Sequence, residues 1–193
     1  MSVTIRPSGD AYRLAREVID ALGQQCPGAG CGEGRCVERA CTGFEPHLTL
    51  QYVYDVPAAE IESVAAALEQ LFRDARPVRI AFGAVGTFSG FPGVHVEVEP
   101  NRELVDLYLR TKQALAALGR RTYEYDSASW RPHLSLSCRH WTGDAVERIR
   151  QAFPRLPASF QADRVQINRL DGARWIVLRD VPLRSAVSWR LAG

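Results

Sequence analysis

Two short segments of the sequence repeat one pattern of a histidine followed by a hydroxyl residue. The segments are His-Leu-Thr-Leu at 47–50 and His-Leu-Ser-Leu at 133–136. Side chains alternate between the two faces of an extended strand, so each segment presents its histidine and hydroxyl on one face and its leucines on the other. An imidazole exchanges protons near neutral pH, and a hydroxyl donates a hydrogen bond to an anionic oxygen. The candidate site residues are His47, Thr49, His133 and Ser135.

A lone histidine in a strand is more often structural than catalytic, so a structural role for these histidines has to be weighed against a catalytic one. Here, however, two of only four histidines in the chain fall in the same local pattern. The repeat therefore favours a shared chemical role over coincidence.

The predicted elements around the two motifs also repeat. Each half of the chain gives, in order, a strand, a helix, a loop, a motif strand, a helix and a strand. The predicted strands cover 3–6, 47–54, 78–84, 94–99, 133–139, 160–170 and 173–180, and Asp171-Gly172 predicts a tight hairpin. Such a duplication predicts two similar lobes related by a pseudo-twofold axis, with the two motif strands facing each other across one cleft.

The duplicated motif and the order of elements resemble the 2H phosphoesterase superfamily, which includes bacterial 2'-5' RNA ligases and 2',3'-cyclic phosphodiesterases. The resemblance implies an α+β fold with two mainly antiparallel sheets around a central cleft. We expect one domain over 1–193, with lobes of about 1–90 and 91–180 and a Cys- and Gly-rich loop at 23–45.

Family membership would imply metal-independent hydrolysis of 2',3'-cyclic phosphates to 2'-phosphates. In-line opening of the ring needs a base on one side of phosphorus and an acid on the other, and two histidines supply that pair. By the resemblance, His47 gives a proton to the 3' oxygen and His133 activates water, while Thr49 and Ser135 bind phosphate oxygens. With a 5'-hydroxyl in place of water, the reverse reaction would form a 2'-5' RNA linkage.

For the reaction we expect no cofactor and no metal, since the chemistry requires neither and the sequence has no carboxylate cluster or His-Glu helix motif that would indicate a catalytic metal site. The expected partners are RNA ends or small cyclic nucleotides, bound by a monomer. Two alternatives stay open. One is a 2H-type phosphodiesterase with another substrate, such as a 2'-5' oligonucleotide or an ADP-ribose cyclic phosphate, and the other is a non-catalytic module that binds RNA ends.

The composition is that of an ordinary globular protein, with 46% hydrophobic and 24% charged residues. A net charge of +2 argues against extensive binding of a long nucleic acid. No apolar run is long enough to cross a bilayer and no signal peptide is apparent, so we expect a cytoplasmic enzyme.

Several residues near the motifs are secondary candidates with structural alternatives. Arg131 and Arg139 could bind phosphate or lie in solvent at a strand end. The aromatic residues Phe44, Trp130 and Trp141 could stack on a nucleobase, but packing is the commoner role of an aromatic beside a core strand. His95 and His140 lack the motif, and we interpret them as structural or exposed.

The four cysteines Cys26, Cys31, Cys36 and Cys41 recur at intervals of five within the predicted loop. This spacing does not match the close pairs of common zinc sites. Free thiols, two disulfides or a redox switch, and a structural metal site all remain open, and we favour thiols or disulfides over a metal.

Overall fold

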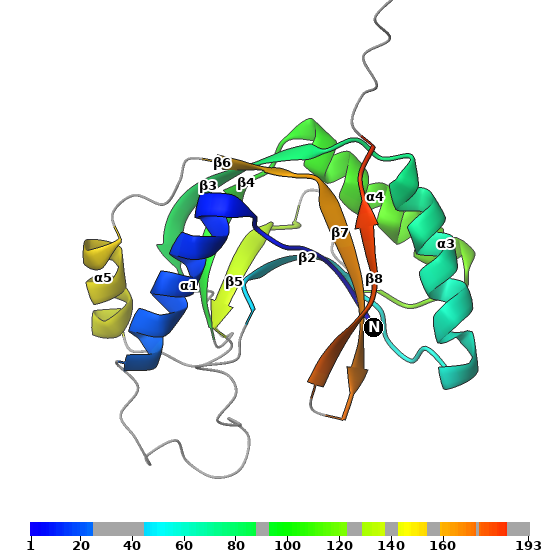
Figure 1. Ribbon diagram of the computed structural model, residues 1–193, viewed down its shortest axis with the longest axis horizontal. Helices are drawn as coiled ribbons and strands as arrows, with labels where there is room; N and C mark the ends of the chain where they lie inside the picture. Colours follow the sequence, from blue (N-terminus) through cyan, green and yellow to red (C-terminus); the bar gives the residue numbers. More distant parts are fainter. Residues whose placement is uncertain are drawn as a thin grey trace, which may run out of the picture.

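The fold is given by a computed structural model. The structure describes residues 1–24, 45–87, 93–122, 129–137, 143–153, 159–172 and 174–184. Within these residues the chain forms four α-helices and eight strands, and the strands make one curled sheet flanked by the helices (Figure 1). The cysteine-rich segment, with Cys26, Cys31, Cys36 and Cys41, lies outside the described residues.

All eight strands belong to one antiparallel sheet with the order β6-β3-β4-β5-β2-β1-β7-β8. The α+β class and the antiparallel pairing are therefore confirmed. The strands are β1 (Ser2–Ile5), β2 (His47–Tyr52), β3 (Val78–Gly86), β4 (Val94–Glu99), β5 (His133–Ser137), β6 (Ser159–Ala162), β7 (Arg164–Asp171) and β8 (Arg174–Pro182).

The two motif strands, β2 and β5, pair with each other at the centre of this sheet. They lie side by side instead of facing each other across a cleft, and their pairing joins the two expected sheets into one. The sheet thus has two four-stranded halves, β6-β3-β4-β5 and β2-β1-β7-β8, and each half takes strands from both halves of the sequence.

The helices α1 (Gly9–Gln24), α3 (Ile61–Arg73), α4 (Arg102–Ala117) and α5 (Gly143–Ala152) are amphipathic. In α1, for example, Ala11, Ala15, Val18 and Leu22 recur at helical spacing, and all four are buried. Helix α4 begins at an Asn101 cap, whose side-chain oxygen accepts a hydrogen bond from the Leu104 amide at 2.8 Å. Helices α1 and α5 contact the β6-β3-β4-β5 half, whereas α3 contacts β7 and β8.

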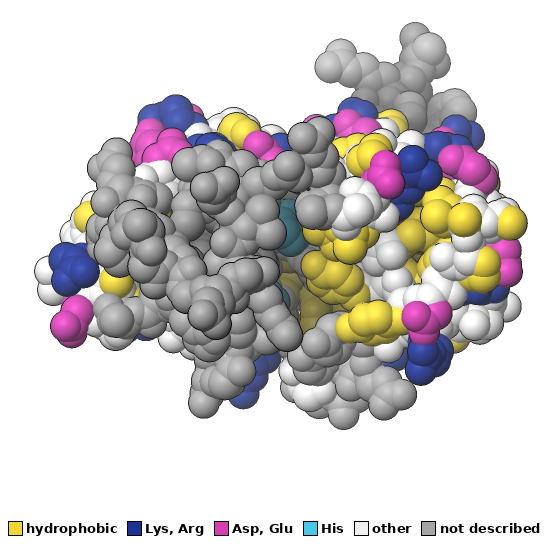
Figure 2. Space-filling view, turned by 90° about the horizontal axis from the view of Figure 1, so that it is seen from below, with side chains coloured by type: hydrophobic (Ala, Val, Ile, Leu, Met, Phe, Trp, Pro, Cys, Tyr) yellow, Lys and Arg dark blue, Asp and Glu magenta, His cyan; other side chains and the backbone are white. Residues whose placement is uncertain are grey.

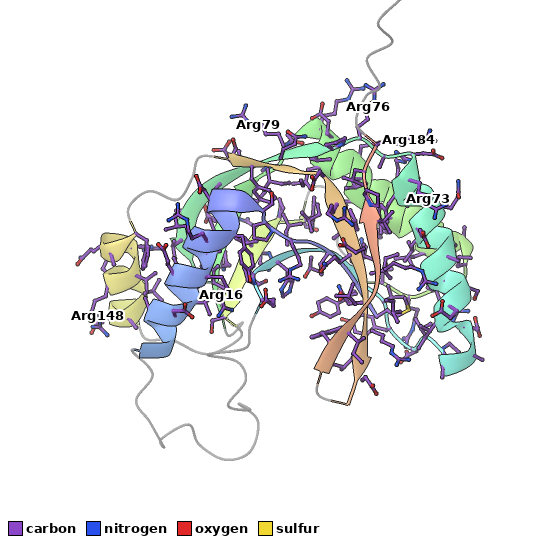
Figure 3. The ribbon with its side chains drawn as sticks, viewed as in Figure 1. Arg16, Arg73, Arg76, Arg79, Arg148 and Arg184 are labelled. Atoms are coloured by element: carbon purple, nitrogen blue, oxygen red, sulfur yellow. The ribbon has the colours of Figure 1, made fainter. Side chains whose placement is uncertain are left out.

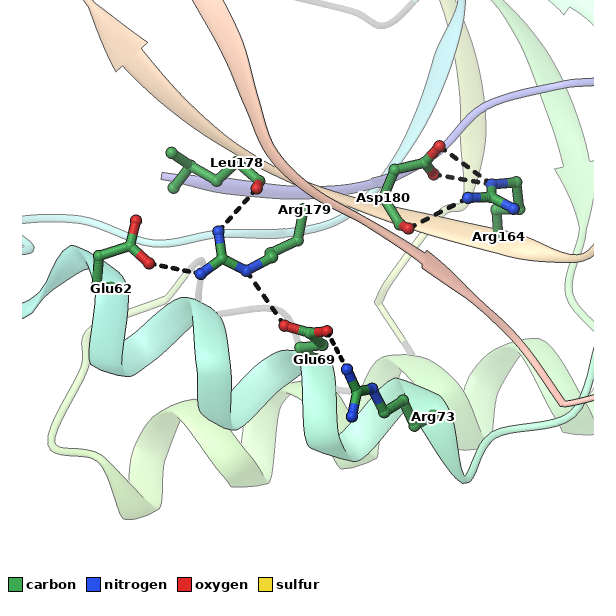
Figure 4. A network of polar contacts seen from close by, with 7 residues as sticks. All are labelled: Glu62, Glu69, Arg73, Arg164, Leu178, Arg179 and Asp180. Carbon is green, nitrogen blue, oxygen red and sulfur yellow. Dashed lines mark hydrogen bonds and ion pairs between the residues drawn. The ribbon is translucent and has the colours of Figure 1, made fainter.

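The polar contacts in Figure 4 tie α3 to β8. Arg179 of β8 donates to Glu62 at 2.6 Å and to Glu69 at 3.1 Å, and Glu69 also pairs with Arg73 of its own helix. On the neighbouring strands Arg164 pairs with Asp180 at 3.0 Å. These pairs are largely exposed, so we expect them to orient the helix more than to stabilise the fold.

The strand predicted over 160–170 is wrong in one respect, because the chain breaks at Asp163 into β6 and β7. Strand β6 pairs with β3 at one edge of the sheet, while β7 pairs with β1 and β8 near the other edge. A single residue can connect two such distant positions only if the sheet curls until its edges approach each other. The Asp163 carbonyl also accepts a hydrogen bond from the Leu183 amide, at 2.7 Å, next to β8.

The hairpin predicted at Asp171-Gly172 forms between β7 and β8. Asp171 is the last residue of β7 and pairs with Arg174, and Gly172 has a φ of 58°. This left-handed conformation favours glycine, which explains why the turn falls here. Figure 1 shows the hairpin extending beyond the rest of the sheet.

Candidate active site

The four motif residues lie together on one face of the paired strands β2 and β5. His47 is directly opposite Ser135, and Leu48 is opposite Leu134. The same register continued by one residue brings Thr49 opposite His133. Residues directly opposite each other in an antiparallel pair share a face, so both histidines and both hydroxyls point to the same side. The two histidines are diagonal neighbours, about 7–8 Å apart between their backbones.

Burial along both strands follows the predicted alternation. His47, Thr49, His133 and Ser135 are half-buried, whereas Leu48, Leu50, Leu134 and Leu136 are at most 2% exposed. The leucines therefore anchor the opposite face of the strands in the core. Figure 2 shows histidine side chains at the bottom of a hollow near the middle of the molecule. The four motif side chains are therefore on the partly exposed face of the two strands.

Each motif histidine is held by the same hydrogen bond. The Nδ1 atom of His47 lies 2.8 Å from the carbonyl oxygen of Glu45, and Nδ1 of His133 lies 3.0 Å from that of Arg131. A carbonyl oxygen only accepts, so Nδ1 carries the hydrogen in both rings. In the neutral imidazole, the lone pair is then on Nε2, which is the nitrogen that can take up a proton.

The surroundings lower the pKa of both motif histidines. Burial lowers the pKa of His47, the Glu45 hydrogen bond raises it, and the charges of His133 and Arg6 lower it further. Burial also lowers the pKa of His133, and its hydrogen bond to Arg131 raises it. Because the charge of His133 acts on His47, the two rings are close enough to influence each other's protonation.

A third histidine, His95 of β4, adjoins the motif pair and was not expected in the site. It is opposite Ser135 in the β4–β5 register, and its ring centroid lies 5.4 Å from that of His133, with the ring planes at 67°. His95 is only 4% exposed, and burial, together with the charge of His133, lowers its pKa to about 4. His95 is therefore a neutral ring beside His133 at neutral pH.

Arg6 is a second residue that the motif alone did not indicate. Ile5 is opposite Leu48, so one further step of the register brings Arg6 opposite His47. Its guanidinium pairs with the Glu45 carboxylate, which also accepts a hydrogen bond from the Tyr12 hydroxyl at 3.0 Å. Glu45 thus fixes His47 through its carbonyl and Arg6 through its side chain. A cation beside His47 favours binding of an anion there.

Six other arginines are labelled in Figure 3. Figure 3 labels Arg73, Arg76, Arg79, Arg148 and Arg184 at the periphery of the molecule. The labelled Arg16 differs, because it lies on α1 with its guanidinium 4.0 Å from the Glu45 carboxylate.

The secondary candidates have mixed outcomes. Arg131 contributes its main-chain carbonyl to the site, and its side chain is exposed. Trp130 stacks on Tyr108 with ring centroids 4.1 Å apart and packs against the core, so packing is its role here. The candidates outside the described residues are Phe44, Arg139, His140 and Trp141.

Within the described part of the chain, no three side chains of the metal-ligating types gather closely enough to hold a metal ion. In the same part, no helix is both long and apolar enough to span a membrane.

Comparisons with known proteins identify the family of the chain. The family model of the 2'-5' RNA ligase superfamily matches residues 39–174, which include both motifs. Comparison with curated proteins gives no match. Among solved structures, the chain is similar to LigT of E. coli complexed with 3'-AMP, at 17% identity and a TM-score of 0.63, covering 95% of this chain and 97% of that one. It is also similar to the protein TT0787 of Thermus thermophilus, at 16% identity and a TM-score of 0.61, covering 96% and 98%. These likenesses support the same fold, and with the family match they lead to one conclusion: the chain belongs to the 2'-5' RNA ligase superfamily of 2H phosphoesterases.

Proposed function

We propose that this protein hydrolyses 2',3'-cyclic phosphates, on RNA ends or on nucleotides, to 2'-phosphates, and that His47 and His133 are its catalytic residues. The observation that carries the proposal is the placement of two imidazoles from duplicated motifs on one face of adjacent strands, each with its Nδ1 hydrogen bonded to a main-chain carbonyl. Membership of a phosphoesterase superfamily supports the reaction class. The 3'-AMP bound to LigT supports a ligand of nucleotide size.

In this reaction, Nε2 of one histidine removes a proton from water, and the water oxygen forms a bond to phosphorus. The bond from phosphorus to the 3' oxygen breaks, and the other histidine gives its proton to that oxygen. The products are a 2'-phosphate and a free 3'-hydroxyl. The hydroxyls of Thr49 and Ser135 donate hydrogen bonds to the non-bridging oxygens, on which negative charge grows in the transition state.

Family resemblance assigns the proton donor to His47 and the acceptor to His133. Repulsion between the two charged rings is reciprocal, so a proton on one of them lowers the pKa of the other and favours one neutral and one protonated imidazole. A diester with 4-nitrophenolate as leaving group needs no proton donor, so it separates the two roles. The His→Ala variant of the donor would keep activity on this diester, whereas the variant of the acceptor would lose activity on both substrates.

The main test is an assay of the purified protein on 2',3'-cyclic AMP and on an oligonucleotide with a cyclic phosphate end, with the position of the product phosphate determined. We expect 2'-phosphate products, a rate unaffected by chelators, and loss of nearly all activity in His47→Ala and His133→Ala. Thr49→Ala and Ser135→Ala should lower kcat by about 10- to 1,000-fold, as for loss of one hydrogen-bond donor to transition-state charge.

Two matched variants control for loss of structure. Thr49→Ser keeps the hydroxyl and should keep most of the activity, and Gln70→Ala changes an exposed residue of α3 away from the motif strands. Full activity in either single histidine variant would refute the paired mechanism. Turnover of 2'-5'-linked oligonucleotides or ADP-ribose cyclic phosphate, with no turnover of the cyclic nucleotides, would assign another substrate to the same site. Tight binding of RNA ends without any turnover would indicate a binding module.

A further inference from the structure

Beside the histidines, an apolar surface extends along the β7–β8 hairpin. Three of its side chains are strongly exposed for their type, namely Leu170 at 55%, Trp175 at 47% and Val177 at 45%. The fourth, Tyr52 of β2, is half-buried, and its ring meets that of Trp175 edge-on with the centroids 5.8 Å apart. Figure 2 shows a hydrophobic surface next to the hollow that contains the histidines. We name Tyr52, Leu170, Trp175 and Val177 the hairpin surface.

Strand register places the hairpin surface on the same face of the sheet as the motif residues. On β1, Thr4 is opposite Thr49 and Ser2 is opposite Tyr52, so Thr49 and Tyr52 share a face although they are three residues apart. The odd spacing is possible because a bulge in this pair shifts the alternation along β2.

The same face continues across the sheet to the hairpin. Ser2 is also opposite Asn168 of β7, and the Asn168 side chain donates to the Thr4 hydroxyl at 3.0 Å, which confirms that the two side chains point the same way. Asn168 is in turn opposite Val177, and Leu170 is opposite Trp175. The histidines, the two threonines and the hairpin surface therefore form one continuous face.

This face is concave. Tyr52 and Trp175 are on strands separated by β1 and β7, and three strand spacings amount to about 14 Å in a flat sheet. Their rings nevertheless meet at 5.8 Å. The curl therefore brings the hairpin over the face that carries the histidines. Along β2, Thr49 and Tyr52 are at most about 10 Å apart, a separation that one nucleotide can bridge.

We propose that the hairpin surface binds the nucleobase of the nucleotide whose phosphate lies between His47 and His133, with Trp175 as the stacking residue. This inference rests on the proposed function, because the phosphate position is taken from it. An aromatic ring with about half of its surface exposed offers a face for stacking, and stacking tolerates all bases. The face supplies a polar region for the phosphate and sugar at the histidines and an apolar one for the base at the hairpin, which matches the polarity of a nucleotide.

The chain offers a close control for this proposal. Ile176 follows Trp175 on the same strand and is 37% exposed, but it is opposite Arg169 and points to the other face of the sheet. A variant at Ile176 therefore perturbs the same hairpin without touching the hairpin surface. Trp175→Phe keeps an aromatic ring, and Trp175→Ala removes it.

The test is calorimetric binding of two ligands to the full chain and its variants. One ligand is adenosine 2'-monophosphate, and the other is methyl riboside 2-phosphate, which has the same sugar and phosphate but no base. We expect the parent protein to prefer the nucleotide. Trp175→Ala should weaken nucleotide binding roughly tenfold and leave the base-free ligand unchanged, from the usual strength of base–aromatic stacking. Trp175→Phe and Ile176→Ala should bind both ligands like the parent.

Several results would overturn the inference. The first is equal affinity of the parent protein for the two ligands. The second is a Trp175→Ala variant that binds both ligands equally more weakly, or that binds the nucleotide as tightly as the parent does. The third is an Ile176→Ala variant that loses as much affinity for the nucleotide as Trp175→Ala does. A dimer of the parent that Trp175→Ala dissociates in sedimentation would also overturn it, since a second copy would then cover the surface. Turnover measured in parallel separates the two proposals. Discrimination between the ligands without turnover contradicts the proposed function alone, and turnover without discrimination contradicts the base site alone.

Discussion

Replacing His95 with a side chain that does not titrate should make the protein less sensitive to acid. In the folded protein the pKa of His95 is about 4, because the ring is buried and the charge of His133 is near. In the unfolded chain it returns to about 6.5. The unfolded state thus binds a proton more readily, so the stability due to the neutral ring is present above pH 6.5 and is lost as the pH falls towards 4.

The size of the effect follows from the difference between the two pKa values. Relative to pH 7, stronger proton binding by the unfolded state lowers the free energy of unfolding by about 2 kcal/mol at pH 5 and by about 3 kcal/mol at pH 4. Because His95 is only 4% exposed, solvent screening does not reduce this figure much. A loss of this size is a large part of the roughly 5–15 kcal/mol that stabilises a typical domain.

The assay is urea unfolding of the parent, His95→Phe and His95→Gln at half-unit steps from pH 7.5 to 4.5. The stability of the parent relative to either variant should fall by about 2 kcal/mol between pH 7 and pH 5. Val96→Ala, a core variant of the next residue on β4, should give a difference that does not depend on pH. A constant difference between the parent and both His95 variants would refute the argument that His95 is buried in its neutral form.

Three further variants test other parts of the structure. Gln51 is 1% exposed, and neither polar atom of its side chain has a hydrogen-bond partner among the described residues, so Gln51→Leu should raise the unfolding free energy by about 1–2 kcal/mol in urea titrations. Phe72→Ala removes a fully buried ring of α3 and should lower the unfolding free energy by about 3–5 kcal/mol in the same assay. A decrease below about 1 kcal/mol would contradict the packing of this ring in the core. Arg6→Gln removes a charge that lowers the pKa of His47, so an NMR titration of the imidazole should give a higher pKa, and an unchanged value would contradict the proximity of Arg6.

The local structure of the motif strands could be predicted because it depends on alternation within each segment. His47 and Thr49 are half-buried and the leucines between and after them are buried, as the period of two requires. The helices could be predicted for the same reason, since their apolar residues repeat at helical spacing. The duplication of elements led to the expectation of two similar lobes, and the strand order shows one sheet with two four-stranded halves.

What could not be predicted depends on which strands become neighbours. The pattern V-H-V-E-V-E correctly indicates that His95 alternates with buried valines, but only the pairing of β4 with β5 places it against His133. The hairpin was recognised from its turn, yet its position over the histidine face follows from the curl of the sheet. Trp130 and Trp175 illustrate the same limit. The tryptophan nearer the motif in sequence packs on Tyr108, and the distant one lies on the exposed part of the concave face.

The break at Asp163 has a mechanical consequence for the whole molecule. One residue joins the end of a strand at one rim of the sheet to the start of a strand near the opposite rim, so these two strand ends cannot separate by more than about 7 Å, the span of two peptide steps. The halves are also hydrogen bonded to each other through β2 and β5. Linked at both places, the sheet restricts changes in the spacing of the two imidazoles, so a ligand meets a concave face that is already formed. Lengthening the connection at Asp163 by a few glycines would let the two strand ends move apart while leaving every histidine in the sequence.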